Sequence, residues 1–145
     1  MVTQVWAGTV SAGCWLDVAD RYSIEPELLY AIAKVESKLD PQAVNHNRNG
    51  SRDVGLMQIN SIHMPQLRAR GITEQRLLNE PCLAIDVGAS ILAQFISKHG
   101  YNWTAVGAYN AGSLPGREHL RIRYARKVYR YYQELLADER AALKF

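Results

Sequence analysis

The chain has 145 residues, which is the usual size of one folded domain and too few for two. Hydrophobic residues make up 48% and charged residues 21%, a globular composition that excludes disorder and low-complexity repeats. Charged or polar residues interrupt every apolar run well before the roughly 18 residues that cross a bilayer, so we expect no membrane span.

The net charge of +3 is concentrated at the C-terminal end, where residues 117–145 hold eight basic and four acidic residues. The basic side chains at the start of this segment are Arg117, Arg121, Arg123, Arg126, Lys127 and Arg130. Such a cluster can meet an anionic polymer, but on a helix it is more often a solvated face. No DNA-reading or RNA-reading motif accompanies it, so we expect no nucleic-acid partner.

Cys14 and Cys82 are the only cysteines, and their spacing fits no zinc motif, so we expect no metal site. On count alone, two inert thiols and one disulfide are equally compatible with the sequence. Val10–Ala12 is a small-residue pattern like that before a signal-peptidase cut, although no basic segment precedes it. We therefore interpret residues 1–13 as the remainder of an export signal or an expression artefact. A lipid-modified Cys14 is disfavoured because it would leave Cys82 unpaired.

Helical periodicity begins at the first cysteine. Apolar residues recur at helical spacing over residues 14–22, and a second helix is predicted from about Pro26 to Lys38. Leu28, Ile32 and Glu36 follow one another at intervals of four. Glu36 is therefore expected to flank the apolar face of this helix, near its end.

The next segment has the chemistry of turns. Asparagine, glycine and serine are frequent over residues 41–54, and Asn49-Gly50 is the strongest hairpin signal in the chain. We expect a small β-hairpin or structured loop around residues 44–54. Gly55 to Asn60 then form a short apolar run.

The remainder of the chain predicts more helices. Their expected ranges are residues 62–70, 73–79, 81–98, 103–109 and 118–136. The predicted fold class is thus mainly α with a small β element, as one domain over residues 14–136. Residues 137–145 are expected to be a C-terminal tail.

Glu36 and Asp53 are the candidate catalytic carboxylates. A glutamate on a helix is usually a solvated surface residue, and an aspartate in a turn-rich segment is usually a cap. Glu36, however, flanks an apolar stripe, where partial desolvation would raise its pKa and keep it protonated as a general acid. Two carboxylates in unlike environments are a common device for cleaving glycosidic bonds.

Three ordered motifs carry a family resemblance. Glu36-Ser37 and the Gly-Leu-Met-Gln-Ile-Asn of residues 55–60 resemble the goose-type and bacterial soluble lytic transglycosylases. They are also similar to the C-type lysozymes, including the interval between the two acids. The Ala-Tyr-Asn-Ala-Gly of residues 108–112 resembles the transglycosylases alone. The chain is most similar to the invasion-associated type III group among the specialised transglycosylases of type III and type IV secretion systems and type IV pili.

This resemblance implies a lysozyme-like fold, a Cys14–Cys82 disulfide and a periplasmic location. It implies peptidoglycan glycan strands as substrate, secretion-apparatus components as possible partners, and no cofactor. Glu36 matches the catalytic acid/base of the family. The residues matching substrate contacts are Ser37, Asn47, Met57, Gln58, Asn60, Tyr109, Asn110 and Tyr124. Alternatively, Met57 belongs to the core, and Tyr109 and Tyr124 are packing aromatics.

Two reactions remain open. In the transglycosylase interpretation, Glu36 protonates the MurNAc–GlcNAc β-1,4 bond and the muramyl C6 hydroxyl closes a 1,6-anhydro product. In the lysozyme interpretation, Asp53 is a nucleophile or stabilises the transition state, and water completes hydrolysis. The motif at residues 108–112 favours the transglycosylase, acting in local cell-wall remodelling as a secretion apparatus assembles. A non-catalytic wall-binding scaffold and an anionic-polymer binder are the competing classes.

Overall fold

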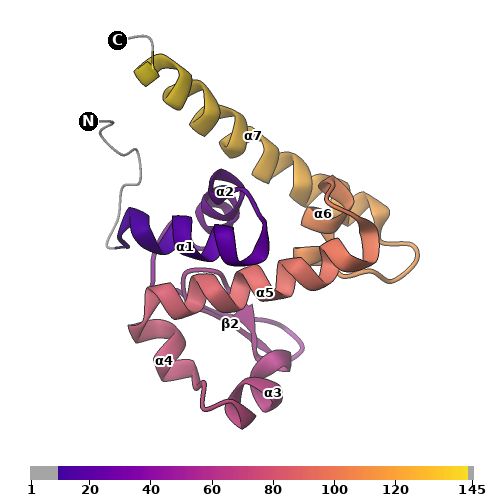
Figure 1. Ribbon diagram of the computed structural model, residues 1–145. Coiled ribbons are helices and arrows are strands. Elements are labelled where there is room, and N and C mark those ends of the chain that lie inside the picture. The colour runs from indigo at the N-terminus through magenta and orange to yellow at the C-terminus, as the bar shows by residue number, and fades with distance from the viewer. Residues whose placement is uncertain (1–9, 144–145) are drawn as a thin grey trace.

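Helices dominate the computed structural model, which describes residues 10–143 (Figure 1). Three short strands form an antiparallel sheet in the order β1-β2-β3. The elements are α1 (Ala12–Tyr22), α2 (Pro26–Ser37), β1 (Val44–His46), β2 (Arg52–Val54), β3 (Ile59–Asn60), the 3-10 helix η1 (Ser61–His63), α3 (Met64–Ala69), α4 (Glu74–Asn79), α5 (Pro81–His99), α6 (Trp103–Ala111) and α7 (Glu118–Leu143). The expected mainly α class with a small β element is confirmed.

The sheet holds one strand that the sequence did not predict. The expected hairpin is present as β1 and β2, in which Val44 pairs with Val54. Strand β3 adds to β2 by pairing Ile59 with Val54 and Asn60 with Asp53. Two residues are too few for alternation of polar and apolar side chains to signal a strand. This third strand matters for function because it brings Asn60 beside Asp53.

Helix α5 runs through the middle of the molecule, with α1 on one side and the sheet and α4 on the other (Figure 1). Its apolar residues Ile85 and Leu92 are fully buried, as are Leu29 and Ile32 of α2. Burial of each such side chain contributes roughly 1.5–3 kcal/mol to the hydrophobic stabilisation. The core therefore fixes α2, which carries Glu36, against the rest of the domain.

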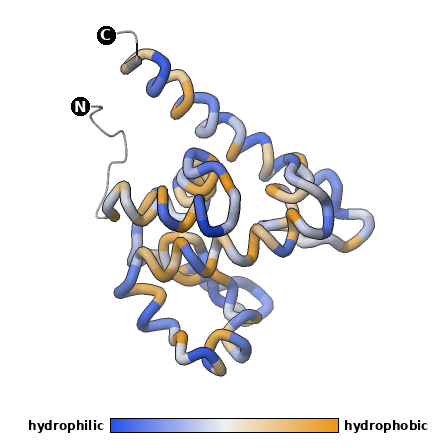
Figure 2. Tube along the Cα trace, viewed as in Figure 1, coloured by the Kyte–Doolittle hydropathy of each residue, from blue (hydrophilic) through white to orange (hydrophobic). Residues whose placement is uncertain are grey.

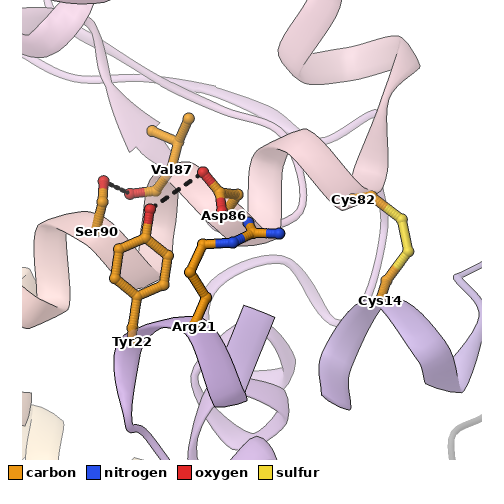
Figure 3. A network of polar contacts seen from close by, with 7 residues as sticks. All are labelled: Cys14, Arg21, Tyr22, Cys82, Asp86, Val87 and Ser90. Carbon is orange, nitrogen blue, oxygen red and sulfur yellow. Dashed lines mark hydrogen bonds and ion pairs between the residues drawn. A yellow bond between two sulfur atoms is a disulfide. The ribbon is translucent and has the colours of Figure 1, made fainter. Parts of the chain in front are cut away.

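Two sets of contacts join α1 to α5 (Figure 3). At one end Cys14 and Cys82 form a disulfide, with their Cα atoms 5.5 Å apart, so the pairing that the resemblance implies is confirmed. At the other end Arg21 forms an ion pair with Asp86, and the Tyr22 hydroxyl donates a hydrogen bond of 3.2 Å to the same carboxylate. The disulfide closes a long loop, which in the chain-entropy account contributes on the order of 4 kcal/mol.

Helix α7 is longer than the sequence predicts and projects from the body of the molecule (Figure 1). It continues past the expected end at Leu136 to Leu143. Hydrophilic and hydrophobic residues alternate along this helix, including its projecting part (Figure 2). Residues 137–143 lack an apolar stripe but are mostly strong helix formers, so propensity extends the helix where periodicity gives no signal.

The contact between α6 and α7 is unusually close. A Cβ atom added at Gly107 of α6 would lie 2.5 Å from the carbonyl oxygen of Arg121 in α7. Arg121 itself is buried, and its guanidinium donates to the carbonyl oxygens of Gly112 at 2.9 Å and Leu114 at 3.1 Å. Arg121 therefore ties down the α6–α7 connection, and its inclusion in an exposed basic face was wrong.

The first described helix begins slightly earlier than the helix expected from Cys14. Residues 1–9, most of the segment interpreted as a leader remnant, lie outside the described part of the chain. Ala12 and Gly13, assigned to the same segment, belong to α1. Among residues 10–143, none of the helices combines the length and the apolar character that a membrane crossing requires.

Candidate active site

Glu36 lies in the last turn of α2. The helix begins at Pro26, whose fixed φ suits a first helical position, and it is closed by Lys38 in the left-handed conformation with φ 54°. The apolar stripe that includes Leu28 and Ile32 is buried, so Glu36 emerges where this stripe reaches the surface of the core. Its side chain lines a cavity of about 350 Å³. The full lining is Val35, Glu36, Asn110, Ala111, Arg117, Leu120, Arg123, Tyr124 and Lys127.

The environment of Glu36 is that of a general acid. Burial is the largest influence and raises the pKa of its carboxyl to about 7, and the negative charge of Asp53 acts in the same direction. The Tyr124 hydroxyl and the positive charge of Lys127 lower this pKa, by smaller amounts in total. A carboxyl with a pKa near 7 can both give and accept a proton at neutral pH.

Tyr124 of α7 stands against Glu36. Its hydroxyl is buried, and among residues 10–143 it is the one buried side-chain oxygen or nitrogen without a hydrogen bond of standard geometry. It nevertheless lies close enough to the Glu36 carboxyl to lower its pKa. Burial, followed by the charge of Glu36, raises the pKa of Tyr124 well above its ordinary value, so the phenol remains protonated. Tyr124 is thus a donor held beside the acid.

Tyr109 of α6 connects the helices to the loop before β3. Its hydroxyl donates a hydrogen bond of 2.6 Å to the carbonyl oxygen of Met57. Burial and the charges of Glu36 and Asp53 raise the pKa of Tyr109 well above its ordinary value. Tyr109 therefore lies near both carboxylates, while its neighbour Asn110 is exposed and lines the Glu36 cavity.

Asp53 is held within the sheet by two asparagines. Asn47 donates from Nδ2 to one carboxylate oxygen at 3.1 Å, and Asn60 donates to the other at 2.9 Å. Asn60 also caps η1 by accepting from the backbone N–H of Ile62 at 3.0 Å. The two oxygens of Asp53 thus have amide partners from β3 and from the turn that follows β1.

Gln58 is a buried amide that organises the same region. Its Nε2 donates to the carbonyl oxygens of Gly55 at 2.9 Å and Ala43 at 3.2 Å, and its Oε1 accepts from Asn45 at 2.7 Å. Its backbone has φ 50°, an uncommon conformation for a residue with a side chain. We call Asn45, Asn47, Asp53, Gln58 and Asn60 the sheet cluster. Each of these five side chains has a hydrogen-bond partner within the cluster.

Of the eight predicted substrate contacts, only Asn110 and Tyr124 line the Glu36 cavity. Two of the other six, Ser37 and Met57, make structural contacts. The Ser37 hydroxyl bonds to the carbonyl oxygens of Leu56 at 2.7 Å and Ala33 at 3.1 Å, which joins α2 to the loop before β3. The Met57 side chain is fully buried and packs against Gly88 of α5. A Cβ atom added to Gly88 would lie 2.8 Å from the Cβ of Met57. Their roles toward substrate stay predictions, since both side chains have structural contacts.

Three cations of the C-terminal basic cluster line the cavity, a position beside Glu36 that the sequence did not predict. Arg117 precedes α7, and Arg123 and Lys127 lie on the face of α7 that also presents Tyr124 to Glu36. Their spacing around Tyr124 places them on one helical face, but only the docking of α7 on α2 shows that this face meets Glu36. We call Glu36, Tyr124, Arg117, Arg123 and Lys127 the helical cluster.

Other parts of the described chain offer less to a reaction. Two cavities of about 260 and 650 Å³ lie between α6 and α7, away from Glu36. The acid in the first, Glu25, accepts a hydrogen bond of 2.6 Å from Tyr132, and the acid in the second, Glu118, is paired with Arg121. Residues 10–143 contain no cluster of His, Cys, Asp and Glu that could hold a metal ion.

The fold and the site define a class of enzyme. A helical domain with a small sheet, and one half-buried glutamic acid of pKa about 7 at a helix end, matches the lysozyme-like group of glycosidic-bond-cleaving enzymes. The fold also matches a solved structure of the lytic transglycosylase Slt, an inactive mutant from Pseudomonas aeruginosa, with a TM-score of 0.71 at 22% identity over 95% of this chain and 26% of that one.

Sequence comparison gives the family. The family model described as the transglycosylase SLT domain matches residues 13–132. Invasion protein IagB of Salmonella typhimurium is 53% identical over 88% of this chain and 79% of its own length, and protein IpgF of Shigella flexneri is 43% identical over 89% and 85%. A peptidoglycan-binding-like protein of Escherichia coli O157:H7 is 41% identical over 92% and 84%. The chain belongs to the transglycosylase SLT domain family and is a lytic transglycosylase.

Proposed function

We propose that this enzyme cleaves the MurNAc–GlcNAc β-1,4 bond of peptidoglycan and forms a 1,6-anhydro-muramyl end. Glu36 gives its proton to the glycosidic oxygen as the bond to muramyl C1 breaks. The C6 hydroxyl of the same muramyl residue then attacks C1, and Glu36 takes the proton of that hydroxyl. One C–O bond is broken and one is formed, water is not consumed, and Glu36 ends in its starting state.

The observation that carries this proposal is the pKa of Glu36, raised to about 7 by burial within the cavity. One group must act first as acid and then as base in the reaction, which is most efficient when its pKa is near the working pH. Membership of the transglycosylase SLT domain family supports the assignment. Tyr124 supplies a protonated hydroxyl beside the carboxyl, which stabilises its ionised form midway through the reaction.

Asp53 is proposed to organise the sheet rather than to attack the sugar. Both of its oxygens accept hydrogen bonds from asparagines, which fixes the orientation of the carboxylate within the sheet cluster. Through this network Asp53 positions Asn47 and Asn60, which we propose as substrate contacts together with Asn110. A muramidase that uses Glu36 and Asp53 is the second candidate, favoured by one observation: the charge of Asp53 acts on Glu36.

Mass spectrometry of the muropeptides released from purified sacculi distinguishes the transglycosylase reaction from the muramidase reaction. We expect ends one water lighter than reducing ends, a loss of roughly a thousandfold in rate for Glu36→Gln, and the same anhydro product from Asp53→Asn at a reduced rate. Reducing ends that disappear with either variant would establish the hydrolase instead. Wild type that releases no muropeptides, together with a Glu36→Gln protein that binds sacculi equally well, would identify a non-catalytic wall-binding scaffold.

We further propose that the enzyme is exported to the periplasm and opens the wall locally for assembly of a secretion apparatus. The similarity to proteins named for invasion supports this role, and the disulfide supports an oxidising compartment. The test is fractionation of cells expressing the native gene together with thiol labelling. Protein found in the periplasmic fraction without free thiols supports the location, whereas reduced protein in the cytosolic fraction contradicts it.

A further inference from the structure

The cations of the helical cluster take no part in the ion pairs found among residues 10–143. Arg117, Arg123 and Lys127 line the Glu36 cavity, and none of the three forms an ion pair with another residue of the 10–143 range. The contrast is Arg121 on the same helix, which is buried and pairs with Glu118 at 3.2 Å. Unpaired cations gathered around one cavity raise the local concentration of anions.

The catalytic acid does not account for all three charges. Glu36 is the only acid that lines the cavity, and the general-acid step requires it to be neutral. Lys127 acts on Glu36, since its charge lowers the pKa of that carboxyl. Arg117 and Arg123 are not among the groups that act on Glu36 in this way. Both arginines are exposed at the cavity, so their guanidinium groups are available to a bound anion.

The proposed substrate carries negative charge at one place only. GlcNAc is uncharged, and every carboxylate of the glycan strand belongs to the lactyl substituent of the muramyl residue or to the peptide linked to it. The muramyl ring is also one of the two sugars that flank the bond cleaved at Glu36. Cations next to Glu36 are thus next to the ring that bears the carboxylates.

We infer that Arg117 and Arg123 bind a carboxylate carried by the lactyl substituent of the muramyl residue, and that they select peptidoglycan over uncharged glycans. The inference rests on the proposed function. A guanidinium matches a carboxylate through two parallel N–H···O bonds, whereas the ammonium of Lys127 acts as a point charge. The two arginines are therefore specificity-determining residues for the reaction that Glu36 performs.

The experiment compares three soluble glycan strands of equal length. The first bears peptides, the second is stripped by an amidase so that its lactyl carboxylates are free, and the third is stripped and then has those carboxyls reduced to alcohols. Wild type, the double variant Arg117→Gln/Arg123→Gln and the control Arg130→Gln are assayed on each. Arg130 is exposed on α7 but does not line the Glu36 cavity. Unfolding midpoints are measured for all three proteins.

We expect the double variant to lose about tenfold in kcat/KM on carboxylate-bearing strands, and to match wild type on the reduced strand, as the loss of charge-assisted hydrogen bonds predicts. Arg130→Gln should match wild type throughout. A deficit confined to the peptide-bearing strand assigns the carboxylate to the peptide, and one confined to the stripped strand assigns it to the free lactyl group. A deficit on both charged strands means that the arginines bind either carboxylate. An equal loss on all strands, or no loss, overturns the inference while leaving the proposed function intact. Absence of cleavage by wild type on every strand overturns both.

Discussion

The sheet cluster and the helical cluster carry similar polar side chains but satisfy them differently. In the sheet cluster, Gln58 has three hydrogen-bond partners and both oxygens of Asp53 have amide donors. In the helical cluster, the Tyr124 hydroxyl lacks a hydrogen bond of standard geometry and Glu36 has a pKa of about 7. The hydrogen bonds of the sheet cluster fix its geometry, whereas polar groups of the helical cluster remain available to interact with the substrate.

The largest expected effect is on the helical cluster, through Glu36→Gln. Burial raises the folded-state pKa of Glu36 from 4.5 to about 7, so its stabilising contribution is complete below pH 4.5 and is lost as the pH rises through 7. Glutamine resembles the protonated form. Chemical unfolding should show equal stabilities near pH 4 and a variant up to about 3 kcal/mol more stable at pH 8.

Glu134→Gln, at an exposed position of α7, is the control for that experiment and should follow wild type at both pH values. A Glu36→Gln protein that gains nothing at pH 8 would mean that the helical cluster is not destabilised by the ionised acid.

In the sheet cluster we expect substitution to lower the stability, and Gln58→Ala tests this. Removal of the amide breaks its three hydrogen bonds, to Ala43, Gly55 and Asn45, and should cost about 2 kcal/mol in urea unfolding. Gln58→Gly loses the same bonds but suits the backbone at φ 50°, so it should be about 1 kcal/mol less damaging. Equal losses in the two variants would contradict the role given to the backbone.

Two buried tyrosines provide a smaller, matched test. Tyr109→Phe removes the hydrogen bond to the Met57 carbonyl and should cost roughly 1 kcal/mol, because that acceptor is left without its partner. Tyr124→Phe removes a hydroxyl without a standard bond and should change the free energy of unfolding by less than about 0.5 kcal/mol. Equal costs from thermal unfolding would remove the distinction between the clusters.

The smallest expected effect is a shift in the alkaline limb of the pH–activity profile, which follows the pKa of Glu36. Tyr124→Phe and Lys127→Met remove influences that lower this pKa, so each should move the limb to higher pH. Asp53→Asn removes a charge that raises it and should move the limb to lower pH. Initial rates on soluble glycan strands, measured from pH 5 to 9, give the direction of each shift. Shifts of the same sign in Asp53→Asn and Lys127→Met would contradict the electrostatic account.

Much of the fold could be predicted because, for most helices, the hydrophobic periodicity agrees with the residues that start and end the helix. Pro26 begins α2 and the stripe through Leu28 and Ile32 is buried as expected, so the raised pKa of Glu36 followed from local pattern alone. The extension of α7 to Leu143 was missed because propensity, not an apolar stripe, maintains it.

The site itself could be predicted only in part, because the rest depends on contacts between distant elements. The register of β2 and β3 brings Asn60 to Asp53, and a two-residue strand gives no periodic signal. The packing of α7 against α2 and α6 decides that Arg123 faces Glu36 while Arg121 is buried. Neighbouring arginines on one helix therefore have different roles that composition does not separate.

The close approach of α7 to Gly107 has a further consequence for the chemistry. Any side chain at position 107 would act as a spacer and displace α7 together with Tyr124 and Lys127, the two groups that lower the pKa of Glu36. The acid strength of the catalytic group is therefore coupled to a packing contact that contains no charge and lies on another side of the same helix. A glycine in α6 therefore keeps in place the two groups of α7 that act on the ionisation of Glu36.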